Sequence, residues 1–346
     1  MLRYVLLALG LLTLSLLVWH IGLGNIYEAA SGLGPGALLI VLIPSLSMYV
    51  IEAYGWNVAL LPLAHEVPFS RLWAIRTAGE VVNMTTPTAY VGGEPLKAYL
   101  LQKHGVPIVK GLASVVIAKT TMTIAQVLFI LVGIALAFWV LGAKGSSMHV
   151  VGAALLSVGI LAFGMVGFVL VQRQGLFTWI LALTRKTGWS VRFLESREEK
   201  LRALDFTILN FYTHHQRAFY ASIGLYLAGW LTEAIEVFVI IHYLGGPADM
   251  LSALSIGALS VLIKGGTFFI PGSLGAQDAG NLVLLKAFGY SDVTGITFAL
   301  LRRFRELVWI GVGLLCLMIV GRPDRIVQDI HDRTGSPESE KIHEDR

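Results

Sequence analysis

The chain has 346 residues, of which 55% are hydrophobic and 14% are charged, and its formal net charge is +4. A mean hydropathy of +0.72 excludes an ordinary soluble domain, whose surface needs more charge, and indicates a polytopic membrane protein. The small positive charge is typical of loops at a membrane surface rather than of a nucleic-acid-binding protein. The single cysteine, Cys316, excludes a disulfide framework and a cysteine metal site, and we expect no cofactor.

Six apolar stretches are each long enough to cross a bilayer as a helix, since a span needs about 20 apolar residues. They run near residues 4–20, 36–61, 112–141, 148–171, 218–244 and 294–320. The first follows Arg3 and could also be a signal peptide, but we favour a retained span. Two further stretches, residues 72–104 and 251–289, are interrupted by polar segments with helix-breaking glycine and proline. We therefore predict an all-α polytopic membrane protein with about six full spans and two broken segments.

Basic residues predict how the first broken segment is oriented, because cytoplasmic loops carry an excess of lysine and arginine. Residues 72–104 have such residues at both ends, namely Arg71, Arg76, Lys97, Lys103 and Lys110. Both ends are therefore predicted to be cytoplasmic, which makes this segment a re-entrant helical hairpin. The loops 22–34 and 245–250 contain neither lysine nor arginine and are predicted to be external. The second broken segment, 251–289, should thus re-enter from the external face.

Residues 172–217 join the two halves of the chain and mix basic residues with large apolar ones such as Trp179 and Phe193. This mixture predicts amphipathic helices on the cytoplasmic surface. A solvated linker is an equal alternative. The tail after Gly321 is polar and is predicted to be cytoplasmic, with a disordered end.

Two polar segments repeat one pattern, "EVVNMTTPTAYVGGE" (residues 80–94) and "KGGTFFIPGSLGAQD" (residues 264–278). In each, a charged residue is followed by a proline and then by a carboxylate at equal intervals. When the sequence is aligned with itself at a shift of 184 residues, the two segments coincide, and the alignment continues beyond them without a gap. It aligns Glu52 with Glu236, Glu80 with Lys264, Pro87 with Pro271, Glu94 with Asp278, Gly105 with Gly289, Gly111 with Gly295 and Lys119 with Arg303. Because charges are scarce in this chain, these matches predict an internal duplication.

The two copies are predicted to have opposite topology, which is the arrangement of inverted-repeat transporters with sites near the bilayer midplane on broken helices. The tips of the two hairpins should lie near Pro87 and Pro271, and their irregular backbone must be buried or line a wet cavity. The predicted organisation is an N-terminal span and external loop (1–33), a first repeat (34–141), a connecting span and amphipathic segment (142–217), a second repeat (218–320) and a polar tail (321–346).

Several charged residues fall within or beside the predicted spans, where each costs about 2.5–3.5 kcal/mol at the centre of a helix. They are expected to pair or to face a cavity. Arg302 and Arg303 lie four and three residues before Glu306, so either can pair with it along one helix. The three arginines of "LLRRFREL" outnumber this local carboxylate, which favours an anionic ligand. The alternative, in which the ions only neutralise one another and hold the repeats together, stays open.

Three motifs, "GEVVNMTTPTAYVGGEPLKAYLL", "FFIPGSLGAQDAG" and "LLRRFRELVWIGVG", resemble the flippase-like family named after the membrane region of lysylphosphatidylglycerol synthase, and most closely its hopanoid-associated branch. The likeness extends from about residue 45 to residue 320. It implies a multi-spanning inner-membrane protein that moves or handles lipids. The residues that match the motifs are Glu80, Asn83, Pro87, Gly92, Gly93, Glu94, Pro271, Gly272, Gly275, Gln277, Arg303, Arg305 and Glu306. Lys97, Lys119 and Asp278 depart from the family's usual residues, which leaves the substrate open.

The internal repeat, the charged residues in the predicted spans and the family resemblance together predict a set of substrate-binding residues. They are Glu80, Asn83, Pro87, Gly92, Gly93, Glu94, Lys97, Lys119, Lys264, Pro271, Gly272, Gly275, Gln277, Asp278, Arg302, Arg303, Arg305 and Glu306. Within this set, Arg303 is expected to contact a lipid head group, because its repeat counterpart is Lys119. Arg302 should lean toward Glu306, and Arg305 should pair with a carboxylate such as Asp278.

The function predicted from these features is a flippase that moves an anionic or polyprenoid lipid, such as a hopanoid-related one, between the leaflets of a bacterial inner membrane, with both chain termini cytoplasmic. One alternative is a scaffold that docks lipid-biosynthesis enzymes through residues 172–217. Another is an integral-membrane enzyme, although the sequence has no GxSxG, HExxH or phosphate-binding GxxxxGK[ST] motif. The expected partners are membrane lipids, lipid-biosynthesis enzymes and further copies of the chain, and not nucleic acid.

Overall fold

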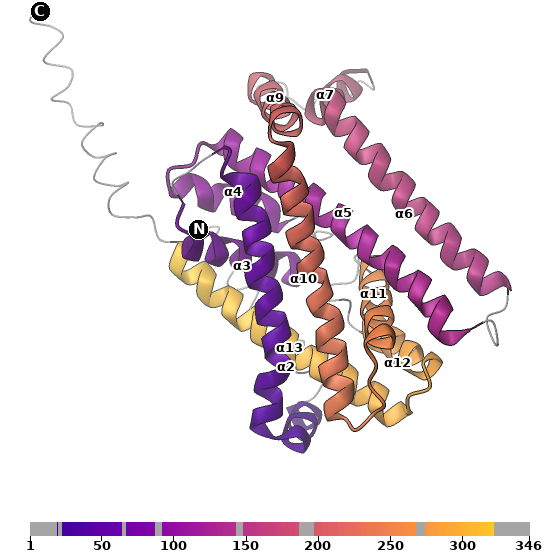
Figure 1. Ribbon diagram of the computed structural model, residues 1–346. Helices are drawn as coiled ribbons and strands as arrows, with labels where there is room; N and C mark the ends of the chain where they lie inside the picture. The colour runs from indigo at the N-terminus through magenta and orange to yellow at the C-terminus, as the bar shows by residue number, and fades with distance from the viewer. Residues whose placement is uncertain are drawn as a thin grey trace, which may run out of the picture.

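The computed structural model is built from helices and describes residues 19, 23–63, 67–86, 92–142, 148–186, 197–267, 273 and 275–321. Within these ranges the helices, in chain order, are α2 (Leu23–Leu60), α3 (Phe69–Thr85), α4 (Gly93–Lys103), α5 (Ile108–Leu141), α6 (Met148–Gln174), α7 (Leu176–Lys186), α9 (Glu198–His214), α10 (Gln216–Tyr243), α11 (Met250–Gly266), α12 (Ala276–Ala287) and α13 (Asp292–Val320) (Figure 1). The predicted all-α class is confirmed.

Three helices in the described ranges are long and apolar enough to cross a membrane: the part of α2 from Leu38 to Leu60, α5 and α10. The pair α6 and α7 adds a fourth candidate span, although it is bent by 88° next to Gly175. The positive φ of Gly175, 96°, allows this break. The chain is thus a multi-pass membrane protein. Its predicted total of six spans stays a prediction, partly because residues 4–20 lie outside the described residues except for Trp19.

The helix α13 has the length of a span but not the composition of one. It covers 29 residues and carries four charged side chains at its centre, Arg302, Arg303, Arg305 and Glu306. Insertion of such a helix into lipid alone would be costly, so its charges need partners from neighbouring helices. All four side chains are buried in the structure.

Both predicted interruptions are confirmed. The stretch 72–104 forms two helices, α3 and α4, which pack against each other, and the stretch 251–289 forms the packed pair α11 and α12. The chain leaves α3 in an extended conformation at Thr86 and enters α12 through Gly275, whose φ is 74°. The predicted tip residues Pro87, Pro271 and Gly272 lie outside the described residues.

The 184-residue shift found in the sequence also relates the helices. It places α2 on α10, α3 on α11, α4 on α12 and α5 on α13. The turn after α4 and the turn after α12 have the same hydrogen bonds: Val106 N–H donates to Leu101 C=O, and Tyr290 N–H donates to Leu285 C=O. Both turns are closed by a glycine of positive φ, Gly105 (91°) and Gly289 (86°), as in a Schellman motif.

The two halves are packed crosswise. The helices α2 and α10 lie side by side at the centre (Figure 1), α3 of the first half packs on α13 of the second, and α11 of the second half packs on α5 of the first. Glycines bring these helices close together, because a Cβ at Gly313 would lie 2.7 Å from Val81 Cβ, and one at Gly133 would lie 2.1 Å from Ala258 Cβ. Each helix pair therefore depends on the other half for its position.

Gly313→Ala should destabilise the protein by about 1–3 kcal/mol, because the new methyl group would overpack the contact between α13 and α3. The matched control is Gly311→Ala on the same helix, where a Cβ meets no atom within 4 Å in the described structure. It should leave stability unchanged or raise it slightly, since alanine is the better helix former. Thermal unfolding in detergent would measure both, and equal melting temperatures for the two variants would contradict this packing.

Candidate functional site

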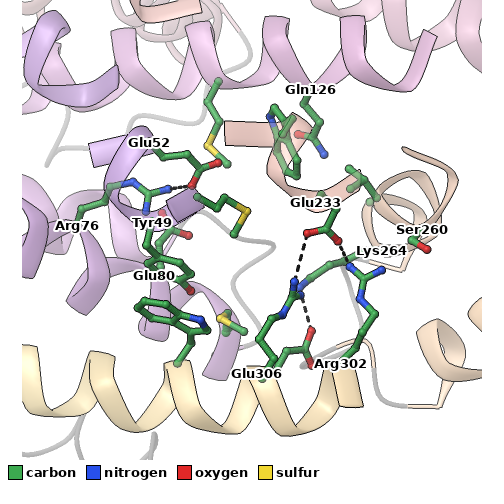
Figure 2. A pocket seen from close by; sticks show the side chains of 18 of the residues that line it. Tyr49, Glu52, Arg76, Glu80, Gln126, Glu233, Ser260, Lys264, Arg302 and Glu306 are labelled. Carbon is green, nitrogen blue, oxygen red and sulfur yellow. Dashed lines mark hydrogen bonds and ion pairs between the residues drawn. The ribbon is translucent and has the colours of Figure 1, made fainter. Parts of the chain in front are cut away.

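A cavity of about 290 Å³ lies among α2, α3, α5, α10, α11 and α13, where the two halves meet (Figure 2). Part of its wall is apolar and comes from Met48, Met84, Met122, Trp230, Val261 and Trp309. The rest is strongly polar. The charged residues that line it are Glu52, Arg76, Glu80, Lys119, Glu233, Lys264, Arg302, Arg305 and Glu306, and they form two clusters on opposite sides.

The first ion cluster comprises Glu52, Arg76, Glu80, Glu94, Lys97 and Lys119. Arg76 of α3 forms a buried ion pair with Glu52 of α2. Lys97 Nζ lies 2.6 Å from Glu80 Oε1 and 3.1 Å from Glu94 Oε2. Lys119 of α5 approaches Glu94 Oε1 at 3.4 Å. The cluster thus links α2, α3, α4 and α5 through charges.

Glycines of the first motif make this cluster possible. A Cβ at Gly79 would lie 2.4 Å from Lys97 Cε, and a Cβ at Gly93 would lie 2.0 Å from the Gly79 carbonyl oxygen. Side chains at these positions would push α3 and α4 apart. Asn83 of α3 also holds α4 close to α3. Its Oδ1 accepts the Gly93 N–H at 2.7 Å, and its Nδ2 donates to Glu94 Oε1 at 3.1 Å.

The second ion cluster comprises Glu233, Glu236, Lys264, Asp278, Arg302, Arg303, Arg305 and Glu306. Arg302 and Arg305 of α13 both form ion pairs with Glu233 of α10, and Arg305 also pairs with Glu236. On the other face of α13, Arg303 donates to both oxygens of Asp278 at 2.8 and 2.9 Å. Glu306 binds Arg303 at 2.6 Å and Lys264 at 3.1 Å.

The repeat correctly matched one ion pair in each half. Lys119 and Glu94 correspond to Arg303 and Asp278 under the 184-residue shift, and both pairs are present in the structure. Their surroundings differ. The side chain of Lys119 is 35% exposed and lines the cavity, whereas that of Arg303 is 3% exposed and also donates to the Ser273 carbonyl oxygen at 3.1 Å. Among the described residues, Arg303 is thus a structural ion rather than part of the cavity wall.

One predicted pairing on α13 is wrong, because Arg302 pairs with Glu233 rather than with Glu306. Arg305 pairs with carboxylates as predicted, but these are Glu233 and Glu236 rather than the suggested Asp278. Residues three apart lie about 60° apart on a helix, so Arg302 and Arg305 share the face of α13 that meets α10. Arg303 is rotated away from them by about 100° or more and meets α12 instead. The predicted local pair of Arg303 with Glu306 is confirmed.

The surplus of arginine expected from "LLRRFREL" is also absent from the second ion cluster. Four basic residues there face four carboxylates, because Glu233, Glu236 and Asp278 join Glu306. Three of these carboxylates come from helices other than α13, so the local sequence could not show that they balance it. Charge surplus alone therefore gives no reason for an anionic ligand.

The predicted site residues that the structure describes fall into three groups. Those that line the main cavity are Glu80, Lys119, Lys264, Arg302, Arg305 and Glu306. Glu94 and Lys97 line a smaller adjoining cavity with Glu80 and Lys119. Among the described residues, those that line neither cavity are Asn83, Gly92, Gly93, Gly275, Gln277, Asp278 and Arg303. Pro87, Pro271 and Gly272 lie outside the described residues.

Three charged cavity residues are absent from the predicted substrate-binding set. Glu52 and Glu233 are predicted from the sequence only as membrane charges that pair or face a cavity, and Arg76 is not predicted for the site. The sequence interpretation counts Arg76 among the cytoplasmic flanking charges, yet its side chain is 4% exposed. Its spacing offered a signal, because Arg76, Glu80 and Asn83 recur at helical intervals and so share one face of α3. In the described part of the chain, no group of three or more histidine, cysteine or acidic residues could hold a metal ion.

The fold and the cavity define a multi-pass, all-helical membrane protein with two interrupted helix pairs around a charged site. A family model described as "Lysylphosphatidylglycerol synthase TM region" matches residues 3–314, and the chain belongs to this family. The expected family is thus confirmed, whereas its hopanoid-associated branch stays a prediction.

Two curated relatives are both described as UPF0104 membrane proteins. The one from Methanothermobacter thermautotrophicus is 24% identical over 309 residues, which cover 84% of this chain and 86% of the relative. The one from Methanocaldococcus jannaschii is 21% identical over 331 residues, which cover 92% and 95%. No solved structure matches the chain.

Arg305→Met should destabilise the protein by about 3–5 kcal/mol, because Glu236 would lose its ion-pair partner inside the protein. The double variant Arg305→Met with Glu236→Gln should recover part of this loss, since the uncompensated charge is gone. Arg202→Met is the control, because Arg202 forms an exposed ion pair with Glu198 on α9 and should cost less than 1 kcal/mol. Thermal unfolding in detergent distinguishes these cases, and a wild-type melting temperature for Arg305→Met would refute the structural role of this pair.

Proposed function

We propose that this protein is a flippase that moves an anionic or polyprenoid lipid between the two leaflets of a membrane. The head group would enter the cavity between the two halves, while the lipid tails stay in the bilayer. A cavity of about 290 Å³ lies just below the range for drug-sized ligands, about 300–1,000 Å³, so it suits a head group without its tails. The proposal includes a hopanoid-related lipid as a substrate because the sequence motifs resemble the hopanoid-associated branch of the family.

The proposed architecture is a pair of inverted repeats with two re-entrant hairpins, α3–α4 and α11–α12. The common 184-residue register, the matching turns after α4 and α12 and the crosswise packing support it. Basic residues at both ends of the first hairpin favour its entry from the cytoplasm, and the neutral loop before α11 favours external entry of the second. Each half would then expose its hairpin to a different side, as alternating access requires.

The observation that carries this proposal is a pair of accessible lysines in one cavity, one from each half. Lys119 and Lys264 line it with side chains that are 35% and 29% exposed, whereas the arginines beside them are buried. A charged amine inside a membrane protein is costly unless it meets water or a polar ligand. Accessible amines inside this cavity support its proposed role in receiving a polar head group.

The same proposal places the protein in a bacterial inner membrane with both termini cytoplasmic, and it assigns the protein no catalytic reaction. The scaffold alternative rests on α7 and α9, which expose Trp179 and Phe206. A scaffold would use these surfaces and leave the cavity idle, so variants in the cavity separate the two functions.

Lys119→Ala and Lys264→Ala should each lower the rate of lipid translocation at least tenfold in reconstituted vesicles. The loss of a charge-assisted contact to the head group, worth about 1.5–3 kcal/mol, is the physical reason. Lys119→Arg and Lys264→Arg should retain part of the rate, because the charge remains. The assay would follow labelled phospholipid, polyprenyl phosphate and hopanoid in parallel.

Lys286→Ala is the matched control, because Lys286 is an exposed lysine of α12 that pairs with Asp292. It should translocate lipid at the wild-type rate. If folded Lys119→Ala and Lys264→Ala proteins also kept that rate, the cavity would not be the transport site, and the scaffold function would be favoured.

A further inference from the structure

We propose that one side of the cavity is a binding site for the phosphate group of a lipid, formed by Arg302, Lys264 and Trp230. The proposal deepens the flippase function and rests on it for the lipid's access to the site. It names the chemical group that the protein recognises and the side chains that recognise it.

The first argument is an excess of hydrogen-bond donors without partners. Within the described structure, Arg302 Nε and Nη1 and Trp230 Nε1 are buried and form no hydrogen bond, and both residues line the cavity. The nearest carboxylate oxygen recorded for Arg302 Nε, Oε1 of Glu236, is 4.0 Å away, which is too long for a hydrogen bond. Buried donors without partners cost about 1–3 kcal/mol each, so a ligand that accepts from them would be stabilised.

The unpartnered donors gather on one side of the cavity. Trp230 lies one turn before Glu233 on α10, and Glu233 holds Arg302 in an ion pair. Figure 2 shows Arg302, Glu233, Lys264 and Glu306 together on this side, with Glu52 and Arg76 across the cavity. On that opposite side the unpartnered atoms, Arg76 Nη1 and Glu52 Oε1, are one donor and one acceptor. On the side with Arg302, the described structure records three unpartnered donors and one unpartnered acceptor, Glu236 Oε1, so donors are in surplus there but not on the opposite side.

The second argument is that Arg302 and Lys264 can leave their present partners without isolating a buried charge. Glu233 is held by Arg305 as well as by Arg302. Glu306 is held by Arg303 at 2.6 Å as well as by Lys264 at 3.1 Å. Arg302 and Lys264 can thus turn toward a ligand while each carboxylate keeps one basic partner. Because of these second partners, Arg302 and Lys264 can bind an anion even though the four basic residues and four carboxylates of the second ion cluster balance.

These donors fit a phosphate group better than a hydroxyl or a sterol-like surface. A phosphate ester offers several acceptor oxygens, and the guanidinium of arginine matches two of them at once. The indole N–H of Trp230 and the ammonium of Lys264 can reach further oxygens from α10 and α11. Three helices of the second half, α10, α11 and α13, would then hold one group.

Binding of short-chain lipids to the full-length protein in detergent, measured by isothermal titration calorimetry, tests the site. Dihexanoyl phosphatidic acid should bind, and dihexanoyl glycerol, which lacks phosphate, should bind at least tenfold more weakly. Inorganic phosphate alone should also bind at least tenfold more weakly than the lipid. Equal binding of dihexanoyl glycerol would overturn the phosphate site, and equal binding of inorganic phosphate would overturn a lipid as its source.

Trp230→Phe removes one donor but neither a charge nor the aromatic ring, and it should weaken phosphatidic acid binding about tenfold. Trp73→Phe is its control, because Trp73 Nε1 is likewise buried without a partner in the described structure but Trp73 lies outside the cavity wall. Arg302→Lys keeps a charge for Glu233 while it removes the spare N–H groups, and it should also weaken binding about tenfold. Wild-type affinity in folded Trp230→Phe and Arg302→Lys proteins would refute the proposal.

Translocation in vesicles separates this inference from the flippase function. If phosphatidic acid binds as expected but no lipid crosses the bilayer, the phosphate site stands and the transport function fails. If a hopanoid without phosphate is translocated as fast as phospholipid, the transport function stands and the phosphate site fails.

Discussion

The structure depends on one constraint, which is that an ionised side chain inside a membrane protein must have a partner. The central charges of α13 make this helix too polar to insert alone, and their partners come from α10, α11 and α12. The first ion cluster joins α2 to α3 and α4 to α5 in the same manner. Ion pairs therefore position the interrupted helices, which are too short to span a bilayer of about 30 Å as continuous rods.

The basic residues of these clusters differ in whether their carboxylate partners have a second basic partner. Arg76, Arg303 and Arg305 are the closest basic partners of Glu52, Asp278 and Glu236, and their removal would leave these carboxylates with less compensation. Lys119, Lys264 and Arg302 instead share their carboxylates with a second cation. The same network can thus hold the fold with one set of charges and offer another set to a ligand. Under the proposed function, this division would let a balanced cluster bind a polar head group.

Sequence alone predicted the elements that depend on local chemistry or on the repeat. Glycine, proline and polar residues marked both interruptions, and the 184-residue register correctly matched Lys119–Glu94 with Arg303–Asp278. Contacts between helices were harder to predict. The partners of Arg302 and Arg305 lie about 70 residues earlier in the chain on α10, and only the packed structure brings them together. Arg76 was misplaced because its charge resembled a loop signal, whereas its real partner, Glu52, lies on the preceding span.

The opposite entry of the two hairpins is the central claim of this account, and cysteine accessibility tests it most directly. Gln102 on α4 and Lys286 on α12 are exposed and are related by the 184-residue shift. Gln102→Cys and Lys286→Cys would be introduced separately into a Cys316→Ala background and labelled with a membrane-impermeant maleimide in right-side-out and inside-out vesicles. Opposite hairpins predict that Gln102→Cys is labelled from the cytoplasmic side alone and Lys286→Cys from the external side alone. Labelling of both positions from the same side would contradict the inverted arrangement.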